Sequence, residues 1–172
     1  MRKHINYLSA LILLSLAVVS FRSKAQTSGP TNFSGTWVIN LDKSQFNNAP
    51  HYTASKQITV SQTAENLKLS LVQESDAGAD SIANETLPLN GSPFEIVGGD
   101  KKSRKITAQI TDAGKTLTIN TDVSVPNDPN TEQYNSAEAW NLAADGQTLT
   151  VKKSVKATSG FAYTITAVYQ KK

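Results

Sequence analysis

Apolar and polar residues alternate along most of the chain, from Phe33 to its end. The alternating segments are rich in Thr, Val, Ile and Tyr and are separated by short stretches of Asp, Asn and Gly, which is typical of β-strands joined by turns. Apolar spacing of helical period never extends beyond about two turns. We expect every second residue of each alternating segment to face inward. Counted from the first residue of each, these segments are 37–41, 58–62, 67–71, 106–110, 117–125, 134–142, 149–155 and 161–169.

Turn residues fix the pairing of consecutive strands. An Asp145-Gly146 pair is typical of a two-residue hairpin turn, in which both central residues have positive φ. A turn centred there places Trp140 opposite Val151 and Glu138 opposite Lys153. Apolar faces then coincide, whereas a slip of one residue would reverse every side chain. The same reasoning at 113–114 and at 158–160 pairs Ile110 with Leu117, Ala108 with Ile119, Val155 with Tyr163 and Lys153 with Ile165.

Many strands with one apolar face cannot remain a flat open sheet, because the edges would be exposed. We therefore predict an all-β fold over residues 33–172, an up-and-down antiparallel β-barrel of about 8–10 strands, with a β-sandwich as the alternative. The stretch 82–97 alternates less regularly. Pro88 within it indicates an edge strand or a bulge.

The start of the chain, up to Ala25, forms a separate segment. A positive start at Met1-Arg2-Lys3 precedes an uninterrupted apolar run from Leu8 to Val19, and small residues follow at Ser23 and Ala25. This pattern predicts a signal peptide over residues 1–25. Because the apolar run is shorter than the ~20 residues that cross a membrane, an uncleaved anchor is the less favoured alternative. We expect a flexible leader at 26–32 and a mature domain that is periplasmic or secreted, without membrane insertion after cleavage.

The net positive charge of the chain comes from its first 25 residues. The 172 residues include 17 basic and 14 acidic ones, for a net charge of +3. The predicted signal peptide contains Arg2, Lys3, Arg22 and Lys24 but no acidic residue, so the rest of the chain is nearly neutral. A nearly neutral domain gives no electrostatic reason to expect nucleic acid. The absence of cysteine excludes disulfides, thiolate metal sites and cysteine nucleophiles.

The segment 33–46 (FSGTWVINLDKSQF) carries Gly35-x-Trp37 in the first predicted strand. This segment, with 140–151 and 168–172, resembles lipocalins and, more closely, a group of exported bacterial lipocalin-like proteins. The resemblance implies a calycin-type barrel in which Trp37 plugs the closed end. It also implies that Lys171 on the last strand packs across Trp37, where the family usually has arginine. The family's fold binds small apolar molecules.

Few residues could carry chemistry. His51, the one histidine beyond the predicted signal peptide, follows Pro50 in a loop, and no nucleophile or metal-ligand spacing accompanies it. The acidic cluster at Glu74, Asp76 and Asp80 lacks the terminal ligand of a calcium loop. The basic run 101–105 lacks interleaved aromatic residues. We predict no enzyme activity, no metal, no cofactor and no nucleic-acid partner.

Glu138 and Lys153 interrupt otherwise apolar faces and lie opposite each other in the predicted register. They form either an exposed ion pair near a barrel end, worth less than ~1 kcal/mol, or a polar anchor inside a cavity. The candidate ligand-binding residues are Glu138, Lys153, Arg104, Tyr134, Tyr163 and Trp140.

Two hypotheses for the function follow. The first is an exported, monomeric, non-catalytic barrel that binds a small apolar ligand in its interior. The alternative is a structural or interaction protein, or an inhibitor of a secreted enzyme, with a filled barrel that acts through its surface. The volume of the interior distinguishes them.

Overall fold

The computed structural model describes residues 29–75, 77–98, 101–125 and 132–172. In these ranges ten β-strands form one sheet, accompanied by three short 3-10 helices. The helices in this described part of the chain are too short and too polar to cross a membrane. The elements are β1 (Gly35–Ile39), η1 (Leu41–Lys43), η2 (His51–Thr53), β2 (Gln57–Gln62), β3 (Asn66–Glu74), β4 (Asp80–Pro88), β5 (Phe94–Val97), β6 (Ser103–Thr111), η3 (Asp112–Gly114), β7 (Thr116–Ser124), β8 (Tyr134–Leu142), β9 (Thr148–Ala157) and β10 (Ala162–Lys171).

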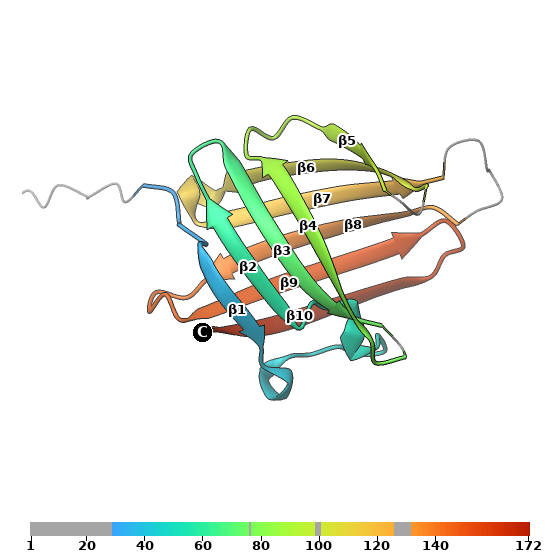
Figure 1. Cartoon of the computed structure of the whole chain (residues 1–172), viewed down its shortest axis with the longest axis horizontal. Helices are drawn as coiled ribbons and strands as arrows, with labels where there is room; N and C mark the ends of the chain where they lie inside the picture. The colour runs from blue at the N-terminus through green and yellow to red at the C-terminus, as the bar shows by residue number, and fades with distance from the viewer. Residues whose placement is uncertain (1–28, 76, 99–100, 126–131) are drawn as a thin grey trace, which may run out of the picture.

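The sheet is an antiparallel meander whose first strand is inserted between the second and the last. Its order is β4-β3-β2-β1-β10-β9-β8-β7-β6-β5. Figure 1 shows that β1 to β4 run obliquely in front of β6 to β10, so the sheet curls back over itself. The predicted fold class is confirmed as an all-β, up-and-down antiparallel sheet of ten strands that curls into a barrel. The alternative of a sandwich is wrong, because all ten strands belong to one sheet.

The barrel has a seam, which we define as the junction between the two edge strands β4 and β5. These strands do not share a hydrogen-bonded ladder. The chain after β4 reaches β6 through an isolated bridge between Asn90 and Gln109 and through the Gly91 N–H, which donates to the Ala108 carbonyl at 3.0 Å. As predicted, Pro88 lies on an edge strand, where its missing N–H interrupts no interior ladder.

The predicted registers are confirmed at all three hairpins. The Asp145-Gly146 turn differs in form, because the chain leaves the ladder after Ala143 and rejoins it at Thr148. The Ala143 N–H donates to the Thr148 carbonyl at 2.8 Å, and Gly146, but not Asp145, has a positive φ (66°). The longer loop extends the turn equally on both sides, so the pairing of Glu138 with Lys153 is unchanged.

Thr31 belongs to the segment predicted as a leader, yet it is attached to the barrel. Its N–H donates to the Gly114 carbonyl at 2.7 Å, and its carbonyl accepts from the Gln62 side chain at 3.0 Å. The last residues before the first strand therefore lie against the barrel. The predicted signal peptide, at 1–25, lies outside the described residues.

One end of the barrel is closed by packed side chains. Trp37 is fully buried, and its indole N–H donates to the Phe33 carbonyl at 2.9 Å. Lys171 is the cross-strand partner of Trp37, and its Nζ lies 5.1 Å from the centre of the Trp37 ring, within the range of a cation–π contact. At Gly35, with φ of +147°, an added Cβ would lie 2.7 Å from Lys171 Cε. The three residues of the lipocalin-like signature thus lie together.

Replacing Trp37 with Phe should destabilise the barrel. The change removes the indole donor from the Phe33 carbonyl and opens space at the closed end, so we expect the free energy of unfolding in urea to fall by about 1–3 kcal/mol. Val38→Ala, on the outer face of the same strand, is the control and should change the free energy by less than about 0.5 kcal/mol. Equal losses in the two variants would contradict this role of Trp37.

Candidate functional site

A cavity of about 400 Å³ occupies the interior, between β2 to β4 on one side and β6 to β10 on the other. Its volume lies within the range of small-molecule sites. Much of its wall is aliphatic, because the inward positions of the alternating strands carry apolar side chains. These residues are Ile58, Leu69, Leu71, Leu87, Ile106, Ile119, Val151, Ile165 and Ala167.

The mouth of the cavity lies opposite the Trp37 end. It is bounded by residues 53–55, at the end of η2 and directly after it, which we call the η2 segment, and by the adjoining ends of several strands. Phe161, at the start of β10, is 60% exposed, and the centre of its ring is 5.8 Å from that of Tyr163. An aromatic pair therefore lies where a ligand would enter.

All six residues predicted to bind ligand line this cavity. Four strands supply them: Arg104 lies on β6, Tyr134, Glu138 and Trp140 on β8, Lys153 on β9 and Tyr163 on β10. The alternation of the strands brings them together, since each occupies an inward position. Their role in ligand binding stays a prediction.

Glu138 is held by two donors. Lys153 Nζ lies 3.4 Å from its Oε1, and the indole N–H of Trp140 donates to its Oε2 at 2.9 Å. The Lys153 and Glu138 side chains are 23% and 21% exposed, so the pair is neither on the outer surface nor fully dry. The pair therefore lies in the wall of the cavity, and its role as a polar anchor for a ligand stays a prediction.

The charge of Lys153 is maintained by its neighbours. Burial acts to lower the pKa of Lys153, but the attraction and hydrogen bond of Glu138, with smaller electrostatic contributions from Tyr163 and Tyr134, outweigh it and raise the pKa above its ordinary value. Lys153 is therefore an ammonium ion at neutral pH and not an amine nucleophile.

Glu85, on β4, also lines the cavity and was not predicted from the sequence. Burial raises its pKa, and the negative charge of Glu138 raises it further, while Arg104 and Lys153 act in the opposite direction. The available signal was its position two residues before Leu87, on the same face of a strand. Because residues 82–97 alternate irregularly, that signal was weak.

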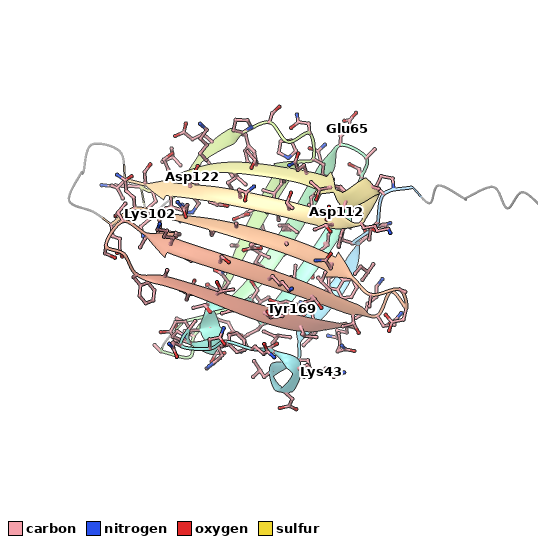
Figure 2. The ribbon with its side chains drawn as sticks, turned by 180° about the vertical axis from the view of Figure 1, so that it is seen from behind. Lys43, Glu65, Lys102, Asp112, Asp122 and Tyr169 are labelled. Carbon is pink, nitrogen blue, oxygen red and sulfur yellow. The ribbon has the colours of Figure 1, made fainter. Side chains whose placement is uncertain are left out.

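Tyr169 lines the cavity from β10 and is almost completely buried (Figure 2). Burial raises its pKa well above the ordinary range of a phenol, the charge of Glu138 raises it further, and a hydrogen bond from the Ser55 backbone lowers it. Tyr169 therefore remains a neutral hydroxyl that connects the wall of the cavity to the η2 segment.

A group of four ionisable residues lies outside the cavity, on the surface. His51 Nε2 lies 3.8 Å from Glu74 Oε2, and Lys56 Nζ lies 3.7 Å from that oxygen and 3.0 Å from Asp80 Oδ1. Asp76 lies outside the described residues. Within the described ranges, His, Asp and Glu nowhere gather in a group of three or more that could hold a metal ion.

The cavity therefore combines an aliphatic wall with a polar band, which we define as Glu85, Arg104, Tyr134, Glu138, Lys153 and Tyr163. Fold and cavity define a class of protein: an antiparallel β-barrel with a cavity that is apolar in most of its wall and charged in one region. A molecule with an apolar body and a polar group matches this arrangement.

No family model matches the chain, and no curated protein matches its sequence. Among solved structures, the ileal bile acid-binding protein of zebrafish, crystallised with cholic acid, is similar to it with a TM-score of 0.48. The two chains are 13% identical, and the match covers 81% of this chain and 98% of the zebrafish chain.

Replacing Glu85 with Gln should stabilise the protein in a pH-dependent way. A carboxyl group whose pKa is raised on folding costs stability above that pKa, and the cost disappears as the pH falls and the group is protonated. We therefore expect Glu85→Gln to raise the midpoint of urea unfolding more at pH 7.5 than at pH 4.5. Glu65→Gln, the same change in an exposed turn, should leave the midpoint unaltered at both pH values. A Glu85→Gln effect that is equal at the two pH values would contradict the raised pKa.

Proposed function

We propose that this protein binds a small, largely apolar molecule non-covalently inside its barrel. The observation that carries the proposal is the cavity of about 400 Å³, whose aliphatic wall is interrupted by the polar band. Transfer of apolar ligand surface from water into such a cavity contributes about 25 cal/mol per Å². This contribution is the driving force for binding, and it needs no covalent step.

The polar band orients the ligand. Lys153, Arg104 and the two tyrosine hydroxyls present N–H and O–H groups to the interior, so a ligand oxygen placed among them gains hydrogen bonds that it would lose elsewhere in the cavity. The apolar body then lies against the aliphatic wall, toward the closed end.

The alternative of a filled barrel that acts only through its surface is less well supported. It required an interior occupied by side chains, and the described residues enclose a cavity instead. The inward-facing Ala167 and Ser136 are small, and they help to keep this space open. We therefore favour the non-catalytic binding function.

The location of the protein is part of the proposal. The charged start, the short apolar run and the small residues before position 26 support export by a signal peptide. The mature domain then acts as a monomer in the periplasm or outside the cell. Ligand in that compartment reaches the cavity without crossing a membrane.

Filling the cavity should abolish binding. Ser136 lines the cavity, whereas its neighbour Ala137 lies exposed on the outer face of β8, so Ser136→Trp and Ala137→Trp are a matched pair. With the neutral fluorescent probe N-phenyl-1-naphthylamine, we expect Ser136→Trp to raise the dissociation constant at least about tenfold, equivalent to ~1.4 kcal/mol. Ala137→Trp should leave it unchanged.

Mass spectrometry of small molecules extracted from natively purified protein provides a second readout. A reproducible apolar molecule that is present in the wild type and Ala137→Trp, and absent from Ser136→Trp, is the expected result. If the probe binds wild type and Ser136→Trp equally, the interior is not the binding site.

Neutralising the central ion pair should change which ligands are bound. The double variant Glu138→Gln/Lys153→Met removes both charges together, so neither partner is left alone in the interior. We expect it to fold and to bind purely apolar probes, and to lose about tenfold in affinity for the molecule extracted from the wild type. Unchanged affinity with unchanged folding would show that the pair plays no part in ligand binding.

A further inference from the structure

Several hydrogen-bond donors gather around Lys153 in the wall of the cavity. Both carboxylate oxygens of Glu138 already receive a donor, one from Trp140 and one from the Lys153 ammonium group. An ammonium group carries three N–H donors, and the nearby Tyr134 and Tyr163 hydroxyls each add one. A ligand group that fits this part of the cavity is therefore an acceptor, and a negatively charged acceptor fits it best.

Glu85 is the one other carboxylate of the polar band. The neighbouring strand β3 presents apolar Leu69 as its cross-strand partner. The charged groups that act on Glu85 come from other strands: Glu138 from β8, Arg104 from β6 and Lys153 from β9. The other titratable groups that line the cavity are Glu132 before β8, Tyr134 on β8, and Tyr163 and Tyr169 on β10.

We propose that the cavity selects ligands with an acidic head group, which Lys153 binds, and that Glu85 takes up one proton from solvent as such a ligand enters. The inference rests on the proposed function and specifies the ligand class and the control of binding. No bond to the ligand forms or breaks. The proton converts the Glu85 carboxylate into a carboxylic acid, so the net charge of the cavity is the same before and after a singly charged anion enters.

The physical reason is the cost of adding a negative charge beside the polar band, which is partly buried and already contains the carboxylates of Glu85 and Glu138. Burial and the charge of Glu138 already raise the pKa of Glu85. A bound anion raises it further, because like charges at short range disfavour ionisation. By linkage, the affinity for the anion must then increase as the pH falls toward the range in which Glu85 is protonated. The protonated group is also a hydrogen-bond donor.

Two fluorescent probes that differ only in an acidic group test the inference. N-phenyl-1-naphthylamine is neutral, and 1-anilinonaphthalene-8-sulfonate has the same rings with a sulfonate that stays ionised from pH 5 to pH 8. We expect the dissociation constant of the sulfonate to rise about tenfold over this range in the wild type, and that of the neutral probe to stay constant. Circular dichroism at each pH checks that the protein is folded.

Two variants assign the effect to residues. Glu85→Gln should bind both probes with little dependence on pH, because the amide cannot take up the proton. Glu138→Gln/Lys153→Met should weaken binding of the sulfonate at least about tenfold more than binding of the neutral probe, which converts to ~1.4 kcal/mol. A sulfonate affinity that is independent of pH in the wild type, or a pH dependence that persists in Glu85→Gln, overturns the inference.

The outcomes also separate this inference from the proposed function. If the neutral probe binds and Ser136→Trp blocks it, while the sulfonate binds no better at pH 5 than at pH 8, the cavity is a binding site and the proton linkage is wrong. If neither probe binds the folded wild type at any pH, the proposed function itself fails.

Discussion

The barrel depends on the two-sided pairing of β1. This strand of five residues is hydrogen-bonded to β2 on one side and to β10 on the other, with Trp37 opposite both Ile58 and Lys171. It is the place where the first four strands and the last six become one sheet. Without that junction the first four strands and the last six would not share a ladder, and the two apolar faces would be held together only by the chain and the few contacts between β4 and β6. Trp37 lies on this central strand and also fills the closed end of the barrel. The strand that joins the two halves of the sheet therefore also supplies the base of the cavity.

In the interior, the cost of removing charged groups from water is set against their attraction for one another. Charged groups inside a barrel lose hydration, and their mutual attraction compensates only where every polar atom finds a partner. Here Glu138 receives both Lys153 and Trp140, and among the described residues every fully buried side-chain nitrogen or oxygen has a hydrogen-bond partner. The pair remains about one-fifth exposed, which reduces the cost of desolvation.

Much of this arrangement could be predicted from the sequence, because a period of two is easily recognised. The registers at the hairpins, the inward positions of Glu138 and Lys153, and the place of Trp37 on the first strand all follow from alternation and turn residues. Glu85 did not follow, since its strand alternates irregularly and pairs on one side only. The form of the Asp145-Gly146 turn was wrong although its register was right, because symmetric lengthening of a loop leaves the pairing unchanged. The size of the cavity was beyond prediction as well, for it depends on how tightly the sheet curls and not on which face each residue occupies.

The resistance of the barrel to widening differs around its wall, because a ladder is missing at the seam. Around most of the wall, a wider interior would stretch ladder hydrogen bonds, and those bonds are lost cooperatively along a strand. Between β4 and β5 no ladder exists to be stretched, and the attachment of that region to β6 consists of a bridge at Asn90 and a backbone hydrogen bond at Gly91. A molecule that widened the interior would therefore separate β4 from β5 and β6 before it broke a ladder between any other pair of neighbouring strands. Glu85 lies on β4, beside the seam, and Glu138 lies on β8. A wider seam would therefore increase the distance between these two carboxylates, so the width of the ligand and the repulsion between the carboxylates are coupled.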